Sequence, residues 1–464
     1  MSMKRREPEQ RGMWVATHEL PRSAGHVFDE KLNEVLAKGG FDRFVEERCA
    51  PYYAAGEGRP SIAPGVYFRM LFVGDFEGLS SQRGIAWRCA DSLSLRSFLG
   101  IALTDWSPEH SSMTRIRKRL PEDVFEKVVT FVLQVARQYG LLKGKTIAVD
   151  STTLEANAAM KSLVRRATGE DWKTYVRGLM AAEGIENPTD EELRRFDRKR
   201  KKKTSNEEWV SATDPASRVT KRKDGRTHLA YQAEHALDVE SELLVAAVIY
   251  RADDADTETL PVTVELARAQ LQAADAPKHG EEVVADKGYH KADTLQTVTE
   301  VQHVRTYISE PKYRGRRRWQ EKPAEQQAIV YANRRRVRGK RGRRLGRWRS
   351  ERVERSFAHP CETGAARRSW LCGVIDVSKS YLGRGAAHNL AVIMLAVFGF
   401  GTARSLQAGM EAMFACIVLL WGLYLSRRRS SAPPGWRQRL QIEWVAAVPS
   451  AVYAPSTATS STGC

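Results

Sequence analysis

The segment Lys145-Thr-Ile-Ala-Val-Asp150 sets a short apolar run directly before a carboxylate. A second segment, Glu281-Glu-Val-Val-Ala-Asp286, has the same form. Short runs rich in β-branched residues predict buried strands, so we expect one strand to end at Asp150 and another at Asp286. In open α/β sheets, functional side chains gather beyond the strand ends. These segments therefore predict an acidic site at one edge of a sheet.

A third acidic residue, Glu354, lies in a predicted helix between two arginines. Val353 and Phe357 are four residues apart and mark the buried stripe of that helix, which leaves Glu354 at the margin of the stripe. Glu351 is the rival, because it lies one turn earlier on a neighbouring position. The spacing favours Glu354 as the third acid and gives Glu351 a supporting or structural role.

Three carboxylates in a basic setting fit metal-dependent phosphoryl transfer. Hard divalent cations take oxygen ligands, and two cations about 3.5 to 4 Å apart can activate the attacking oxygen and neutralise the phosphoryl oxygens. We expect Asp150 to bridge two Mg²⁺ ions, with Asp286 and Glu354 each completing one, and Mn²⁺ to substitute for Mg²⁺. An isolated aspartate at a strand end is more often a cap or turn residue, so the hypothesis requires the three acids to meet.

The charge balance predicts a polyanionic partner. The 464 residues include 74 Lys and Arg against 56 Asp and Glu, a net charge of +18, and the basic residues are clustered, which favours nucleic acid over general solubility. The densest cluster is 331–349, where ten of 19 residues are Lys or Arg and where Tyr331 and Trp348 offer stacking surfaces. The six cysteines show no pairing typical of zinc sites.

A second basic cluster closes the segment 107–119, where a Ser/Thr-capped helix would present its N-terminus and its basic side chains to phosphates. An ordinary solvated helical face explains this segment equally well. The residues predicted to contact double-stranded DNA in the two clusters and beside Glu354 are Arg115, Arg117, Lys118, Arg119, Arg334, Arg335, Arg336, Arg338, Lys340, Arg341, Arg343, Arg344, Arg352 and Arg355.

The order of predicted elements indicates an α/β protein. Apolar residues at helical spacing predict a helical, DNA-binding region over 1–140, and strands follow from residue 145. Three strands (146–150, 228–239, 243–251), then alternating helices and strands (257–272, 283–286, 292–301, 304–308) and a final helix are the order of the ribonuclease-H-like fold, a mixed sheet flanked by helices. We assign the catalytic domain to 141–405, with an insertion at about 151–227 and a basic segment at 311–350, and an atypical tail to 406–464.

The N-terminal segment and the apolar run 412–425 together predict a protein that stays inside the cell. The first residues lack the apolar segment of a secretory signal. The apolar run 412–425 is shorter than the roughly 20 residues that span a bilayer, so we expect no membrane partner and interpret this run as a buried or partner-facing helix.

The chain resembles DDE transposases of bacterial insertion sequences that have a ribonuclease-H-like catalytic core. The resemblance runs from about residue 12 to about 408, and the tail beyond it departs from the family in a way typical of a frameshifted or read-through end. It rests on several segments in one order: Gly65-Val-Tyr-Phe-Arg-Met-Leu, Arg83-Gly-Ile-Ala-Trp, Ser92-Leu-Ser-Leu-Arg, Val149-Asp-Ser-Thr-Thr-Leu-Glu-Ala-Asn157, Asp224-Gly-Arg-Thr-His228, Ala285-Asp-Lys-Gly-Tyr-His290 and Glu351-Arg-Val-Glu-Arg-Ser-Phe-Ala-His359.

The resemblance implies that Asp150, Asp286 and Glu354 are a catalytic triad that cuts DNA at the element's ends and joins the freed 3′-hydroxyl to target DNA. It also implies recognition of terminal inverted repeats by the helical region, a homodimer or higher oligomer at synapsis, and a bacterial cytoplasmic, nucleoid-associated setting. Two alternatives stay open: a metal-dependent nuclease without strand transfer, and an inactive copy that acts only as a DNA-binding protein.

Overall fold

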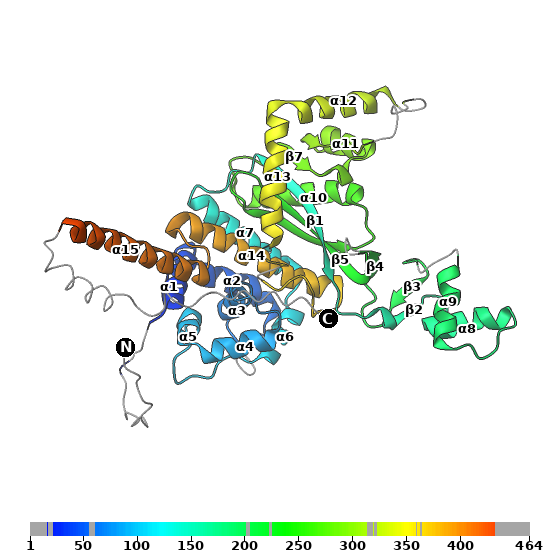
Figure 1. The fold of residues 1–464 in the computed structure, drawn as a ribbon, viewed down its shortest axis with the longest axis horizontal. Helices are drawn as coiled ribbons and strands as arrows, with labels where there is room; N and C mark the ends of the chain where they lie inside the picture. Colours follow the sequence, from blue (N-terminus) through cyan, green and yellow to red (C-terminus); the bar gives the residue numbers. More distant parts are fainter. Residues whose placement is uncertain are drawn as a thin grey trace. The chain divides into compact units, whose positions relative to one another are not determined.

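The computed structural model describes residue 16, residues 22–54, 61–200, 205–221, 225–312, 319, 323–358 and 360–361, and residues 364–431. It divides into two compact units, Met1–Thr402 and Ala403–Cys464. The first unit contains a layer of helices and a mixed sheet, and the second contains the helix α15 (Ala403–Ser431) (Figure 1).

Helices form the N-terminal part of the first unit, as the sequence predicts. The apolar stripe of the last one is confirmed, because Val124, Val128, Phe131, Val132 and Val135 are all buried. Burial of such a stripe is the main source of helix stability in a folded protein. The helices are α1 (Ala24–Gly39), α2 (Phe41–Cys49), α3 (Pro64–Phe76), α4 (Gln82–Asp91), α5 (Leu93–Leu99), α6 (His110–Arg119) and α7 (Glu122–Gln138).

The sheet follows in the order β4-β5-β1-β7-β8, with β6 also paired to β5. β1 is antiparallel to β5 and parallel to β7, β6 is antiparallel to β5, and β8 is parallel to β7. The five predicted strands are therefore present, and the structure adds β4. The strands are β1 (Thr146–Glu155), β4 (Arg218–Lys221), β5 (Thr227–Asp238), β6 (Leu244–Arg251), β7 (Glu282–Ala285) and β8 (Arg305–Ile308).

The predicted end of the first strand is wrong, because β1 continues five residues past Asp150 to Glu155. Its two neighbours explain the difference. The parallel pairing with β7 stops at Val149, whereas the antiparallel pairing with β5 continues to Glu155 opposite Ala230. Asp150 thus lies in mid-strand, at the point where β1 loses one neighbour and keeps the other.

The insertion between β1 and β5 forms a small module of its own. A two-stranded sheet joins β2 (Leu163–Arg165) to β3 (Trp209–Ser211), and α8 (Trp172–Ala182) packs on α9 (Asp190–Lys199) (Figure 1). Val176, Met180 and Leu193 form its apolar centre. Of the basic run 198–203, residues 198–200 lie at the end of α9 and the remainder falls outside the described residues.

Helices cover both faces of the sheet. The side chain of Asp150 meets α13 (Lys340–Ala358), and that of the next residue, Ser151, meets α10 (Asp256–Ala273). Successive strand residues point to opposite faces, so α10 and α13 lie on opposite sides. Two further helical segments follow β7: the short α11 (Ala292–Gln296), which continues as a π-helical turn (Thr297–Val301), and α12 (Ala324–Arg338) beside β8.

One helix joins the helical layer to the sheet. α14 (Val374–Phe398) packs against α3, α7 and β6, and most of its residues are buried. Among the described residues, one helical stretch, Val374–Gly409, is long and apolar enough to cross a membrane, and α14 forms most of it. The burial of α14 is typical of a core helix. The apolar run 412–425 lies in α15, where Met413, Ile417, Leu419, Leu420 and Trp421 are exposed, so the run is not buried within the described part of the chain.

Candidate acidic site

Two of the predicted acids lie side by side on neighbouring strands. The parallel register pairs Val149 with Ala285, and the next residues on the two strands are Asp150 and Asp286. Asp286 directly follows β7 and precedes a short 3-10 helix, Lys287–Tyr289. The sheet therefore brings together two carboxylates that are far apart in the sequence.

Arg349 of α13 lies against both carboxylates. Its Nη1 is 2.6 Å from Oδ2 of Asp150, and its Nη2 is 3.8 Å from Oδ1 of Asp286. The guanidinium is largely buried, with 15% of the side chain exposed. Burial raises the pKa of Asp150, and the charge of Arg349 and the N–H of Ser151 offset that rise only in part.

Glu354 lies in the same pocket as Asp286. This pocket, about 650 Å³, opens between α13 and the ends of β7 and β8, and its lining also includes Arg349 and Glu351. Glu354 is exposed, and Oε1 of Glu351 lies 3.3 Å from Nη2 of Arg355. The structure thus places the two rival glutamates at one pocket.

Across the described part of the chain, no three His, Cys, Asp or Glu side chains are grouped closely enough to hold a metal ion. Asp150 and Asp286 instead share the guanidinium of Arg349, a cation supplied by the protein. The donor set nevertheless suits Mg²⁺ or Mn²⁺, because these ions prefer carboxylate oxygens and these carboxylates already hold one positive charge.

His235 lies opposite Asp150 on the neighbouring strand and connects the sheet to α13. The buried ring lies 2.9 Å from Oγ of Ser356 and 2.8 Å from the hydroxyl of Tyr381, and it stacks on Phe357. Burial lowers the pKa of His235 well below its usual value, so the ring is neutral. The bond to Ser356 and the stacking on Phe357 hold the turn of α13 that carries Glu354, and the bond to Tyr381 connects the ring to α14.

On the other face of the sheet, a buried carboxylate supports the turn after Asp286. Glu234 is fully buried and accepts hydrogen bonds of 2.8 Å from the hydroxyls of Thr259 and Tyr289. Burial raises the pKa of Glu234 to about 7, although these hydrogen bonds oppose the rise. Tyr289 ends the 3-10 helix that begins after Asp286, so this contact helps to hold Asp286 in position.

Several of the predicted DNA-contacting arginines are engaged inside the protein. Arg341 binds the buried Glu282 of β7, and this pair, with Thr146, holds the pKa of Glu282 below its usual range although burial alone would raise it. Three others act in the same way: Arg334 pairs with Glu310, Arg336 with the backbone and hydroxyl of Thr306, and Arg352 with the carbonyls of Val239 and Glu240. Arg355 also pairs with Glu242, but its side chain stays 56% exposed.

The remaining basic residues of this segment form an exposed surface. Exposed side chains on α12 and α13 belong to Arg335, Arg338, Lys340, Arg343 and Arg344. Arg344 also stacks on Trp348, 5.0 Å from its ring centre. A phosphate backbone can contact this surface without disturbing the internal pairs.

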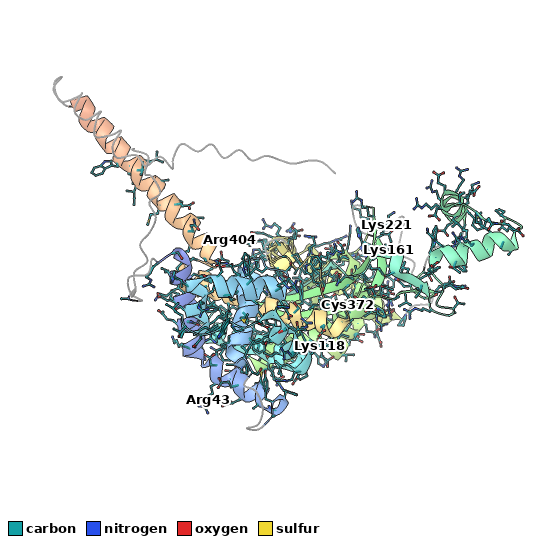
Figure 2. The ribbon with its side chains drawn as sticks, turned by 90° about the horizontal axis from the view of Figure 1, so that it is seen from below. Arg43, Lys118, Lys161, Lys221, Cys372 and Arg404 are labelled. Atoms are coloured by element: carbon teal, nitrogen blue, oxygen red, sulfur yellow. The ribbon has the colours of Figure 1, made fainter. Side chains whose placement is uncertain are left out.

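The basic residues of α6 are also divided between internal and exposed positions. Arg117 is buried, and its guanidinium lies 3.5 Å from a carboxylate oxygen of Asp376. Lys118 is exposed (Figure 2), as are Arg115 and Arg119. The exposed members are available to a phosphate, whereas Arg117 links α6 to α14.

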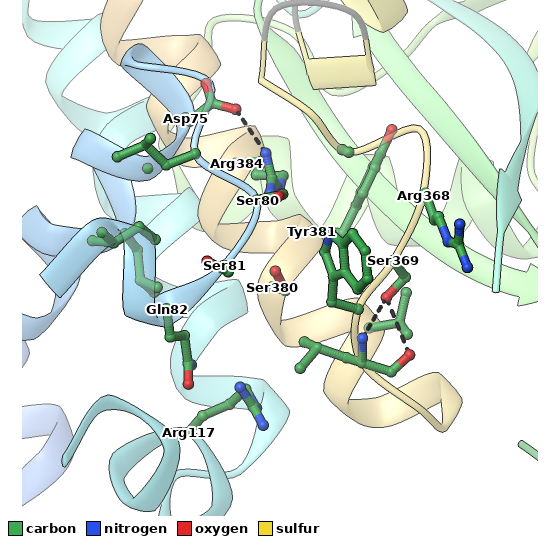
Figure 3. Close-up of a pocket in the computed structure, with 18 of the residues that line it drawn as sticks. Asp75, Ser80, Ser81, Gln82, Arg117, Arg368, Ser369, Ser380, Tyr381 and Arg384 are labelled. Carbon is green, nitrogen blue, oxygen red and sulfur yellow. Dashed lines mark hydrogen bonds and ion pairs between the residues drawn. The ribbon is translucent and has the colours of Figure 1, made fainter. Parts of the chain in front are cut away.

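A second cavity, about 260 Å³, lies between the N-terminal helices and the segment 366–384 (Figure 3). Arg384 faces Asp75 across it at 3.7 Å, and Tyr381 and Arg117 line it. None of the three predicted acids lies in its wall. Asp286 and Glu354 instead line the pocket beside α13, and Asp150 adjoins that pocket through Arg349 without forming part of its lining.

The sequence interpretation missed Arg349, His235 and Glu234. Arg349 has a recognisable signal, since it shares helical spacing with the buried residues Leu345 and Val353, and an arginine in an apolar stripe needs an internal partner. The buried His235 and Glu234 occupy strand positions whose polar partners lie far away in the sequence, so no local pattern marks them.

Comparison with known proteins supports a transposase. Residues 23–119, from α1 to α6, match the family described as Transposase domain (DUF772). No curated protein and no solved structure matches the chain. The match supports an enzyme that transposes DNA, and it covers the helical layer rather than the acidic site.

Proposed function

We propose that the chain is a DDE-type transposase in which Asp150, Asp286 and Glu354 hold two Mg²⁺ ions during cleavage and strand transfer of DNA. The observation that carries this proposal is the meeting of Asp150 and Asp286 on adjacent strands, with Glu354 lining the same pocket as Asp286. The transposase-domain match supports the class of reaction independently of these residues.

A ribonuclease-H-like core is part of the proposal. The strand order β6-β5-β1-β7-β8 supports it. β1, β5 and β6, which come first along the chain, form antiparallel pairs, and β7 and β8 run parallel to β1. A carboxylate on the central strand, a second after the neighbouring parallel strand and a third on a covering helix suit this architecture.

The protein's own residues position the DNA and the acids. When bound, the cations supply Lewis-acid polarisation of the phosphoryl oxygens and activation of the attacking water or 3′-hydroxyl. Asp286 lines the pocket and Asp150 contacts Arg349 beside it, while His235 and Tyr289 hold the elements that carry Glu354 and Asp286. The exposed arginines of α12 and α13 bind the phosphates on either side of the cut.

The helical layer has a separate part in this proposal. It recognises the terminal inverted repeats, with Arg115, Lys118 and Arg119 on phosphates, and two or more copies of the protein hold the two ends together. We place the reaction in the bacterial cytoplasm, on nucleoid DNA.

The test uses DNA that carries the sequences flanking the gene on both sides, incubated with purified protein and Mg²⁺. The breaks are mapped to the nucleotide, and joining to a plasmid target is scored. We expect metal-dependent cuts at the ends of inverted repeats, abolished in Asp150→Asn and Asp286→Asn with DNA affinity retained, because these changes remove carboxylate charge and leave the exposed arginines in place. Glu240→Gln removes an exposed carboxylate elsewhere and serves as the matched control.

The outcomes separate the alternatives. A greater loss in Glu354→Gln than in Glu351→Gln supports Glu354 as the third acid, and the reverse assigns that role to Glu351. Cuts that persist in Asp150→Asn would overturn the proposed site. Cutting without joining identifies a nuclease, and DNA binding without any cut in the wild type identifies a DNA-binding protein.

A further inference from the structure

We propose that Arg349 is an internal cation that occupies the acidic site in place of metal, and that DNA opens the site by drawing Arg349 onto a phosphate. This inference rests on the proposed function, because it takes Asp150 and Asp286 to be metal ligands. It adds a control on metal loading: the free protein holds its acids closed, and the DNA-bound protein binds the metal.

Arg349 lies against the carboxylates of Asp150 and Asp286 at the same time. Its two terminal nitrogens face different acids, one at 2.6 Å and the other at 3.8 Å, and the side chain is largely enclosed. A divalent cation held by the same oxygens would lie within a few ångströms of the guanidinium, where like charges repel, most of all beside Asp150, whose side chain is 26% exposed. Arg349 and a metal held by Asp150 and Asp286 would therefore exclude each other.

A phosphate has access to Arg349 from the open side of the pocket. Arg347, Arg349 and Ser350 line the same pocket as Asp286 and Glu354. A guanidinium matches a phosphate with two parallel hydrogen bonds, so a DNA phosphate in this pocket competes directly with the carboxylates for Arg349. The side chain is long, and it can change partner by rotating about its own bonds while α13 stays in place.

Thermodynamic linkage then couples the two ligands. If DNA removes Arg349 from the acids, DNA raises the affinity for metal, and metal raises the affinity for DNA by the same factor. The coupling should disappear in a protein that lacks the guanidinium.

The experiment measures Mn²⁺ binding to the full chain by electron paramagnetic resonance at constant ionic strength, with and without a short DNA duplex. Without DNA, we expect Arg349→Gln to bind Mn²⁺ about tenfold more tightly than the wild type, a typical size for coupled sites. DNA should raise the affinity of the wild type by a similar factor and leave Arg349→Gln unchanged. Arg349→Lys keeps the positive charge and should remain close to the wild type.

Matched variants separate the possible failures. Arg305→Gln removes one exposed positive charge from β8, outside the proposed DNA-binding set, and an equal gain in this variant would reduce the effect to general electrostatics and overturn the proposal. Equal or weaker Mn²⁺ binding in Arg349→Gln, with binding lost in Asp150→Asn, overturns the role of Arg349 and leaves the metal site standing. Absence of Mn²⁺ binding in every protein, with or without DNA, overturns the proposed function itself.

Discussion

Replacing Glu234 by glutamine should change how the stability of the protein depends on pH. The pKa of Glu234 is about 7 in the folded protein because the side chain is fully buried, against an ordinary value of 4.5. The folded state therefore holds this proton over a pH range in which the unfolded chain has released it. By thermodynamic linkage, the stability that the raised pKa of Glu234 contributes is fully present below pH 4.5 and is lost as the pH rises through 7.

The size of the effect follows from the same two values. Each pKa unit corresponds to about 1.4 kcal/mol, so between pH 5 and pH 8 Glu234 removes about 2 to 3 kcal/mol from the free energy of unfolding. Glutamine keeps an oxygen that can accept the hydrogen bonds from Tyr289 and Thr259, and it does not ionise between pH 5 and pH 8. Glu234→Gln should therefore match the wild type at pH 5 and exceed its stability at pH 8.

Urea denaturation followed by circular dichroism at the two pH values measures this difference. Asp29, whose burial raises its pKa to about 6, contributes in the same direction in both proteins and cancels in the comparison. Glu240→Gln, at an exposed position, is the control for the loss of one negative charge. If the wild type and Glu234→Gln lose the same free energy between pH 5 and pH 8, the reasoning is refuted.

Two further changes test how the acidic site is supported. His235→Ala removes the hydrogen bonds of the ring to Ser356 and Tyr381 and opens a cavity beside Phe357, so it should lower the free energy of unfolding by about 3 kcal/mol in chemical denaturation; a loss below about 1 kcal/mol would contradict this account. Arg341→Ala leaves Glu282 buried without its cation and should lower stability by about 3 to 5 kcal/mol. Arg338→Ala, exposed on α12, should change stability by less than about 0.5 kcal/mol, and similar losses in both arginine variants would count against the internal role of Arg341.

The sequence predicted the elements of this fold well where the signal is local. The stripe of α7 and the strands β5 to β8 follow from apolar periodicity, which reports how one face of an element is buried. The adjacency of Asp150 and Asp286 followed from their common position after apolar runs. The stripe and the strands need no knowledge of which elements become neighbours, whereas the adjacency of the two acids assumed that their strands meet at one edge of the sheet.

Partners distant in the sequence account for what the sequence did not predict. The true end of β1 depends on β5, which pairs with it beyond Asp150. The separation of the arginines into internal and exposed groups depends on acids and carbonyls of other elements, such as Glu282 for Arg341. A basic run shows that positive charge is present, and only the fold shows how much of it remains for a ligand.

The position of α14 has a consequence for how the protein is made. The helices α1 to α7 leave the ribosome early, yet α14, which completes their core against α3 and α7, is synthesised only after the whole sheet. During that interval the apolar faces of the helical layer lack their final partner, and long-range closure of this kind is slow. Nascent chains of this protein should therefore hold exposed apolar surface until late in translation, which makes them natural clients of chaperones that bind near the ribosomal exit.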